Sequence, residues 1–119
     1  MDKVGNLFST LMNAQRRGKL SVHVPFSKLN RNILQALKLQ GYIQDFSCES
    51  DASYGVSLGY IRQIQRVSRP GKRVYLRAAD INKVKRGLGI LLLSTSKGIM
   101  SDQDALHLRV GGEALCYIV

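Results

Sequence analysis

The chain has 119 residues and a formal net charge of +10, from 18 Lys and Arg against 8 Asp and Glu, and 45% of its residues are hydrophobic. This hydrophobic content excludes a disordered basic tail, so a folded surface must display the charge, as expected of a protein that contacts phosphates. No run of 18 or more apolar residues occurs, which excludes a membrane-spanning helix. The length suits one domain or two small lobes.

The first predicted element is an amphipathic helix over residues 3–17. Apolar side chains recur there at helical spacing, Asp2 is placed to cap the start, and Gly18 is placed to end the helix. Alternating apolar and polar residues over 20–24 then predict a short strand, which Pro25 stops. The chain therefore opens with a helix followed by a strand.

A second helix and two strands complete the first half. Ser27 is a good N-cap for a helix whose apolar residues again recur at helical spacing, and Gly41 closes it. Two strands follow, around 42–48 and 54–60, joined by the polar stretch 49–53. The first half therefore reads αβαββ.

The second half is mostly strand. Residues 62–68 and 73–77 look like two strands paired across an Arg-Pro-Gly-Lys turn at 69–72, where Pro and Gly occupy the two central positions of a type II turn. The period of two in the second of these strands places Tyr75 and its flanking arginines on one face and the apolar residues on the other.

Two short helices and two further strands are predicted after this pair. A helical segment over 80–86 and a Gly-Leu-Gly corner lead into a strand over 90–93. Ser101 caps a last short helix, in an approximate capping box with the aspartate three positions on. The Gly-Gly pair at 111–112 ends that helix, and residues 113–119 form a closing strand.

The sequence suggests one boundary between lobes, near residues 60–63. We therefore expect an α+β fold of two small lobes: an N-terminal αβαββ lobe over residues 1–60, and a mostly β lobe with short helices over residues 61–119. Positive charge is concentrated in the second lobe, which carries 11 basic and 4 acidic side chains against 7 and 4 in the first. The second lobe is thus the expected nucleic-acid-binding part.

The two cysteines, Cys48 and Cys116, lie far apart in the sequence and lack the CxxC or Cys/His spacing of metal ligands. Both lie in alternating apolar runs, so we expect two buried, reduced thiols rather than a disulfide or a metal site. A reducing compartment fits this expectation. We expect no metal and no cofactor.

The most informative segment is a polar tip, residues 94–98, which follows an apolar strand without a break. It reads Ser94, Thr95, Ser96, Lys97 and Gly98. Its three hydroxyls can donate and accept hydrogen bonds with sugar hydroxyls, phosphates and base edges, the lysine adds positive charge, and the glycine permits close approach of a backbone. The alternative is an ordinary tight hairpin turn, because turns favour these same residue types.

A run of basic residues supports the nucleic-acid interpretation. No Asp or Glu occurs between Asp51 and Asp80, and that gap contains Arg62, Arg66, Arg69, Lys72, Arg73 and Arg77. The alternative is a solvated face, where such runs are common. Tyr75, between two of these arginines, is placed to stack on a base or ribose, and a half-buried packing role is its alternative.

Enzyme motifs are not matched. The Gly87-Leu88-Gly89 corner opens a strand rather than a helix, so it lacks the context in which a glycine-rich loop binds pyrophosphate. Gly71-Lys72-Arg73 lacks the hydroxyl that a phosphate-binding loop places after its lysine. His23 and His107 are interpreted as a strand residue and a surface helix residue. We therefore expect no enzymatic activity and no small-molecule substrate.

Four segments of the second half form an ordered set. They are Arg66-Val67-Ser68-Arg69-Pro70-Gly71-Lys72-Arg73-Val74-Tyr75, Gly87-Leu88-Gly89-Ile90, Ser94-Thr95-Ser96-Lys97-Gly98-Ile99-Met100-Ser101-Asp102 and Gly111-Gly112-Glu113-Ala114-Leu115-Cys116-Tyr117. In this order and spacing they resemble the bacterial-type eighth protein of the small ribosomal subunit over residues 60–119. The first half is more loosely similar, through Asn13-Ala14 and Pro25-Phe26-Ser27-Lys28-Leu29, and its connection over 49–54 and the strand after it are short for the family.

This resemblance implies a two-lobed α+β protein that binds the central domain of small-subunit rRNA early in subunit assembly and remains there beside neighbouring ribosomal proteins. Bacterial members of the family can also bind a messenger that mimics the rRNA site, so an RNA-binding translational regulator is the alternative function. No secretory or transit signal precedes the first helix, so the protein acts where it is made or the sequence is a mature form. We expect a bacterial cytoplasm or an organelle, with the short connection favouring a mitochondrion.

The resemblance also implies roles for individual residues. The polar tip would offer its hydroxyls to sugars and base edges, its lysine to a phosphate, and its glycine to closely approaching RNA. Glu113 would accept a hydrogen bond from a sugar or a base amino group, or orient the tip. Ser27 and Lys28 would form a secondary contact. The nonspecific phosphate anchors would be Arg69, Lys72 and Arg73.

Overall fold

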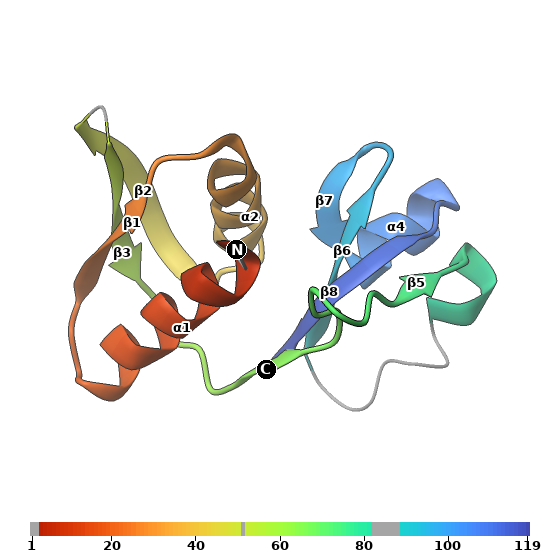
Figure 1. Ribbon diagram of the computed structural model, residues 1–119, viewed down its shortest axis with the longest axis horizontal. Helices are drawn as coiled ribbons and strands as arrows, with labels where there is room; N and C mark the ends of the chain where they lie inside the picture. Colours follow the sequence, from red (N-terminus) through yellow and green to blue (C-terminus); the bar gives the residue numbers. More distant parts are fainter. Residues whose placement is uncertain (1–2, 51, 82–88) are drawn as a thin grey trace. The chain divides into compact units, whose positions relative to one another are not determined.

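The structure, a computed structural model, describes residues 3–50, 52–81 and 89–119 (Figure 1). Backbone contacts divide the chain into two compact units, Met1–Ile61 and Arg62–Val119. Each unit combines helix with an antiparallel sheet, which confirms the α+β class. Among the described residues, no helix is both long and apolar enough to cross a membrane. That the second unit binds RNA remains a prediction.

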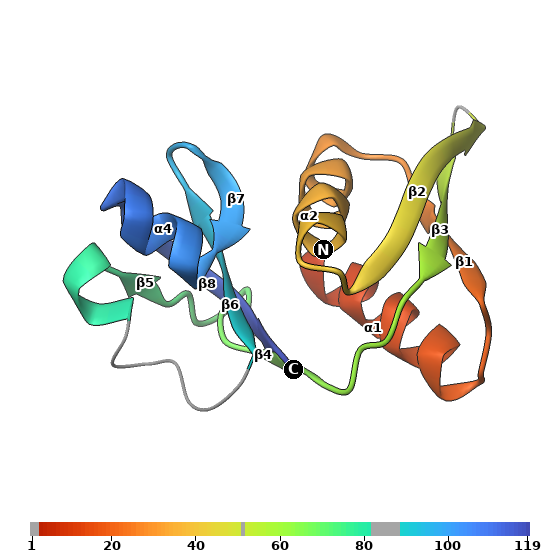
Figure 2. The ribbon, with the colours of Figure 1, turned by 180° about the vertical axis from the view of Figure 1, so that it is seen from behind.

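The first unit has the predicted order αβαββ. Its elements are α1 (Lys3–Arg16), β1 (Ser21–Pro25), α2 (Lys28–Leu39), β2 (Ile43–Ser50) and β3 (Ser53–Leu58). The strands form an antiparallel sheet in the order β1-β3-β2. Both α1 and α2 lie on the same face of this sheet (Figures 1 and 2).

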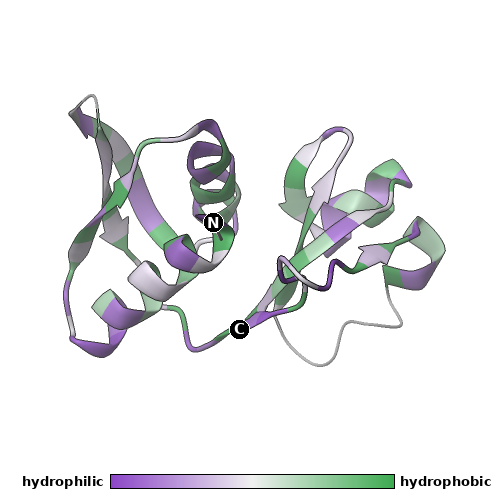
Figure 3. Ribbon diagram, viewed as in Figure 1, coloured by the Kyte–Doolittle hydropathy of each residue, from purple (hydrophilic) through white to green (hydrophobic). Residues whose placement is uncertain are grey.

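The helices of this unit end where the sequence predicts. α2 begins after Ser27, whose hydroxyl oxygen accepts a hydrogen bond from the Asn30 backbone N–H at 3.0 Å. Gly18 follows α1 with φ +71°, and Gly41 follows α2 with φ +83°, a left-handed conformation that glycine adopts with little strain. One side of α2 is apolar and the other hydrophilic (Figure 3). Asp2, the expected cap of α1, lies outside the described residues.

The first strand begins one residue later than predicted. Leu20 precedes β1 and is 86% exposed, so it contributes nothing to the core. Pro25 is the last residue of the strand rather than the residue after it. The reason is that β1 is an edge strand whose extent is set by pairing with β3, from Ser21 to Pro25. A proline is tolerated there because an edge position needs no second ladder hydrogen bond.

The second unit is mostly β with short helices, as predicted. Its described elements are β4 (Ile64–Arg66), β5 (Tyr75–Leu76), a 3-10 turn η1 (Ala78–Asp80), β6 (Ile90–Thr95), β7 (Gly98–Ser101), α4 (Asp102–Leu108) and β8 (Gly112–Ile118). Strand β8 is central: it pairs with β6 along one edge and with both β4 and β5 along the other, and β6 in turn pairs with β7.

The predicted pairing of residues 62–68 with 73–77 is therefore wrong. Strands β4 and β5 both pair with β8, because the chain between them follows the edge of β8 instead of folding back on itself. The turn itself exists, since the backbones of Arg69 and Lys72 exchange two hydrogen bonds of 2.9 Å. It is not type II, which requires a positive φ at the third residue, because Gly71 has no positive φ.

The core of the second unit lies between the sheet and α4. It comprises the buried residues Ile81, Leu91, Leu93, Ala105 and Ala114. Val74 and Leu76 pack against this core while Tyr75 between them is exposed, which confirms the predicted alternation. The Ser101 hydroxyl caps α4 by accepting the Asp104 N–H at 3.3 Å, also as predicted.

Helix α4 ends earlier than predicted, and the helical segment expected over 80–86 is largely untested. α4 ends at Leu108 rather than at the Gly-Gly pair, because Arg109 already adopts the left-handed conformation, with φ +57°. The helical segment expected over 80–86 lies mostly outside the described residues. Within them, η1 ends at Asp80, whose carboxylate accepts a hydrogen bond from Arg77 Nε at 3.0 Å.

The Gly-Gly pair at 111–112 does not end α4 but allows strands to approach closely. A Cβ atom on Gly111 would collide with the Leu76 carbonyl oxygen, and one on Gly112 would collide with the Ser94 carbonyl oxygen. Both glycines are therefore required for the close approach of β8 to its neighbours on both edges. This packing places the next residue, Glu113, directly between β5 and β6.

The cysteines occupy opposite environments. Cys116 is buried in β8, and burial raises the pKa of its thiol far above the ordinary value. Cys48 is exposed, so the prediction that it is a core thiol is wrong. It lies near the end of β2, an edge strand, where the sheet is closing into the β2–β3 turn.

This difference predicts stepwise thiol reactivity. In the native protein, a thiol reagent such as 5,5′-dithiobis(2-nitrobenzoate) is expected to modify one cysteine rapidly, because the thiolate is the reactive form and Cys116 is both inaccessible and hard to ionise. Two thiols should react in denaturant. The control is Cys48→Ser, which should abolish the rapid phase. A native protein with two rapid thiols would contradict this placement of Cys116.

Candidate nucleic-acid interface

The polar tip is the turn of the β6–β7 hairpin. Thr95 pairs with Gly98, and Ser96 and Lys97 form the two-residue loop. The Thr95 hydroxyl donates to the Gly98 carbonyl oxygen at 2.8 Å and accepts the Lys97 N–H at 3.1 Å. Gly98 has φ +116°, which a side chain would strain. For Thr95 and Gly98, the hairpin-turn interpretation is therefore correct.

The other polar groups of the tip are available to a ligand. Ser96 and Lys97 are exposed, and Ser94 is partly buried at the end of β6. The side chains of these three residues make no hydrogen bond or ion pair to another described residue. Two serine hydroxyls and one ammonium group thus project from a hairpin that Thr95 holds rigid.

Three residues of the predicted site form one row across the sheet. Tyr75 of β5 is in register with Glu113 of β8, and Glu113 is in register with Ser94 of β6. Residues paired in this way lie on the same face of an antiparallel sheet. Tyr75 is 71% exposed, so the half-buried packing role is wrong for it. The row therefore offers an aromatic ring, a carboxylate and a hydroxyl side by side.

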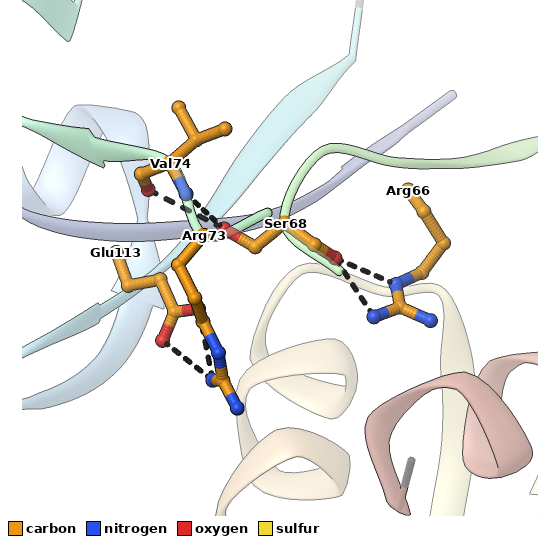
Figure 4. A network of polar contacts seen from close by, with 5 residues as sticks. All are labelled: Arg66, Ser68, Arg73, Val74 and Glu113. Carbon is orange, nitrogen blue, oxygen red and sulfur yellow. Dashed lines mark hydrogen bonds and ion pairs between the residues drawn. The ribbon is translucent and has the colours of Figure 1, made fainter. Parts of the chain in front are cut away.

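A basic loop, residues 68–74, is fixed to the same sheet (Figure 4). The buried Ser68 hydroxyl accepts the Val74 N–H at 2.8 Å and donates to the Val74 carbonyl oxygen at 3.3 Å. That carbonyl also accepts the Ala114 N–H of β8 at 2.9 Å, and the Ser68 N–H donates to the Ala114 carbonyl oxygen at 3.1 Å. The loop is thus closed at its base and attached to β8.

Half of the basic run forms internal contacts. Arg66 donates through Nε and Nη2 to the Ser68 carbonyl oxygen, at 3.2 and 2.7 Å (Figure 4). Arg73 forms an ion pair with Glu113 at 3.1 Å, and Arg77 forms one with Asp80 at 3.0 Å. The free cations of the loop are exposed and have no ion-pair partner among the described residues: they are Arg69 and Lys72.

The pair of Arg73 with Glu113 was not predicted from the sequence. The two residues are 40 positions apart, and their proximity depends on the pairing of β5 with β8, which the sequence prediction did not include. The Ser68 side-chain contacts to Val74 were not predicted either. The signal that points to the approach of β5 to β8 is the Gly-Gly pair before Glu113, which marks a close approach of strands.

The remaining predicted contacts lie in the first unit. Ser27 caps α2 through its hydroxyl oxygen, and Lys28 is the exposed first residue of that helix. Ser27 therefore has a structural role of its own. His23 lies in β1 and His107 in α4, as expected. Among the described residues, no group of three or more His, Cys, Asp or Glu is arranged to hold a metal ion.

This interface is suited to RNA chemistry. Free hydroxyls suit ribose hydroxyls and base edges, an exposed tyrosine suits a base face, and unpaired cations suit phosphates.

Proteins with sequences similar to this chain belong to one class of protein. The chain is 42% identical to the small ribosomal subunit protein uS8 of Neisseria meningitidis serogroup C over 125 residues, covering 98% of this chain and 96% of the relative. It is 40% identical to that of Ruegeria sp. over 127 residues, covering 98% of both chains, and 42% identical to that of Mesorhizobium japonicum over 127 residues.

These relatives identify the class as small-subunit ribosomal proteins. A family model described as "Ribosomal protein S8" matches residues 2–119, and the chain belongs to this family. The resemblance inferred from the second half thus extends over nearly the whole chain. The matched stretches exceed the 119 residues of this chain, so the alignments contain gaps in it. That these gaps lie at residues 49–54 and in the strand after them remains a prediction.

Family membership bears on two further expectations. The expectation of no enzymatic activity is consistent with a family of ribosomal proteins. The relatives are bacterial, and so they give no support to a mitochondrial location.

Two serine-to-alanine variants should separate structural from exposed hydroxyls. Ser68→Ala leaves the Val74 N–H and carbonyl without their side-chain partner in a buried position, so the free energy of unfolding should fall by about 1–3 kcal/mol. Ser96→Ala removes an exposed hydroxyl and should change it by less than about 0.5 kcal/mol. Urea denaturation measures both. A loss below about 0.5 kcal/mol for Ser68→Ala would show that the Ser68 contacts do not stabilise the fold.

Proposed function

We propose that the protein binds the central domain of small-subunit rRNA and supports its assembly as a structural constituent of the small ribosomal subunit. The observation that carries this proposal is the grouping, on one unit, of the free serine hydroxyls of the tip, the exposed Tyr75 ring and the free cations of the basic loop. Family membership supports the same conclusion.

The tip is proposed to make the specific contacts. Double-helical RNA presents a wide, shallow minor groove lined with 2′-hydroxyls, and irregular internal loops expose base edges. Ser94 and Ser96 offer hydroxyls to both kinds of group, and Lys97 offers a positive charge to a phosphate. Thr95 and Gly98 act indirectly, because they hold the turn in the shape that presents the others.

Phosphate contacts are assigned to the free cations. Arg69 and Lys72 lie at the turn of the basic loop, with no carboxylate paired to them in the part of the chain that the structure describes. They supply attraction that does not depend on base sequence. Lys28 is proposed as a secondary contact from the first unit. The bacterial relatives favour the bacterial cytoplasm over an organelle as the compartment.

The proposal predicts opposite behaviour for two variants. Ser96→Ala should weaken binding to a small-subunit rRNA transcript by about 1–3 kcal/mol if an RNA group loses its partner, and should leave binding to unrelated RNA unchanged. Arg69→Ala should weaken both similarly and flatten the slope of log affinity against log salt by about 0.7–0.9. Filter binding over a salt series measures both quantities.

Cosedimentation with small ribosomal subunits is the complementary experiment. A constituent of the subunit should cosediment with it in a sucrose gradient, whereas a protein that acts only on a messenger would remain in the soluble fraction.

The binding experiment has its own contradicting outcome. A Ser96→Ala variant that folds and binds every RNA like the wild type would contradict the role of the tip.

A further inference from the structure

The ion pair between Arg73 and Glu113 connects the basic loop with the row formed by Tyr75, Glu113 and Ser94. We propose that this pair makes Arg73 a specificity-determining residue, oriented by Glu113 as a positioning residue, instead of the nonspecific phosphate anchor that the sequence suggests. The inference rests on the proposed RNA-binding function. Three observations support it. The backbone holds both residues of the ion pair in place, part of the Arg73 guanidinium has no partner among the described residues, and Glu113 neutralises the charge of Arg73.

Both partners are fixed by the backbone. Arg73 directly precedes Val74, whose N–H and carbonyl oxygen are held by the buried Ser68 hydroxyl. The Val74 carbonyl oxygen also accepts the N–H of Ala114, the residue that directly follows Glu113. The Glu113 side chain is only 14% exposed. This pair is therefore better ordered than a surface ion pair between two long, mobile side chains.

Part of the guanidinium remains free for a ligand. Nη1 of Arg73 donates to both carboxylate oxygens of Glu113, at 3.1 and 3.4 Å (Figure 4). Nε and Nη2 make no hydrogen bond to another described residue, and the side chain is 56% exposed. Held by one nitrogen, the planar group presents its other donors in a fixed orientation. It is prepared for two adjacent acceptors, as on a guanine edge or a phosphate.

The pair also removes the charge that would attract arbitrary RNA. Glu113 neutralises Arg73, so a passing phosphate meets little net positive charge there. Arg69 and Lys72 differ, because no carboxylate is paired with them within the described residues. Arg73 therefore contributes to the free energy of binding only when the acceptors of the RNA match its fixed donors. Sequence-independent attraction is left to the two free cations.

A charge-neutral double variant gives the decisive test. Arg73→Gln combined with Glu113→Gln keeps the net charge, so binding to a bacterial large-subunit rRNA transcript should stay within about twofold of the wild type. Binding to the small-subunit rRNA transcript of the same bacterium should weaken at least about fivefold, the lower range for losing a two-donor contact. A double variant that keeps the wild-type ratio of the two affinities would overturn the proposal.

Glu113→Gln alone tests the cancelled charge. It frees Arg73 for any phosphate, so binding to large-subunit rRNA should tighten and its slope against log salt should steepen by about 0.7–0.9. The preference for small-subunit rRNA should fall. An unchanged slope would show that Glu113 does not restrain Arg73.

The matched control is the other arginine–carboxylate pair of this unit, Arg77 with Asp80. Arg77→Gln with Asp80→Asn makes the same neutral exchange and should leave the preference unchanged. An equal loss of preference there would overturn a specific role for Arg73. Circular dichroism checks folding. Should the double variant unfold, Arg73→Lys serves instead, because it keeps the ion pair but lacks the planar donors. It should lower the preference while large-subunit binding stays within about twofold.

The outcomes also separate this inference from the proposed function. A wild-type protein with no preference for small-subunit over large-subunit rRNA would contradict both. A wild-type preference that survives in the double variant and in Arg73→Lys would contradict only the role of Arg73.

Discussion

The arrangement of the second unit depends on hydrogen bonding along both edges of β8. One edge pairs with β6 and so supports the tip, while the other holds β4, the basic loop and β5. Gly111 and Gly112 permit this double approach, since a Cβ atom at either position would collide with a neighbouring carbonyl oxygen. The strand therefore brings together two segments of the site that are distant in sequence, and it contributes Glu113 between them.

Net charge is a poor measure of the charge that such a surface offers to RNA. The basic run contains six Lys and Arg without an acidic residue in sequence, yet three of its arginines bind acceptors within the protein. Burial of the loop base requires some of these contacts, because a carbonyl such as that of Ser68 must find a donor. The fold thereby divides one run of like residues into structural arginines and free cations.

The sequence predicted local structure well and strand pairing poorly, for physical reasons. Caps such as Ser27 and Ser101 and the exposed Tyr75 follow from contacts within a few residues or from the period of a strand. The pairing of β4 and β5 with β8 joins residues 36 to 54 positions apart, and no local signal records it. Cys48 was misplaced similarly, since its exposure depends on β2 being an edge strand. The sequence identified the residues of the tip, but not which of them close the turn and which are available to a ligand.

These separate roles reconcile the two interpretations of the tip, as a tight hairpin turn and as a binding surface. A tight turn and a binding surface are not alternatives here, because different atoms of the same segment serve each purpose. The Thr95 hydroxyl closes the turn as both donor and acceptor. A loop of two residues closed in this way has little conformational entropy left to lose on binding. The exposed Ser96 and Lys97 are consequently presented by a preorganised hairpin, so that more of the free energy of their contacts is available for affinity and for discrimination among RNAs.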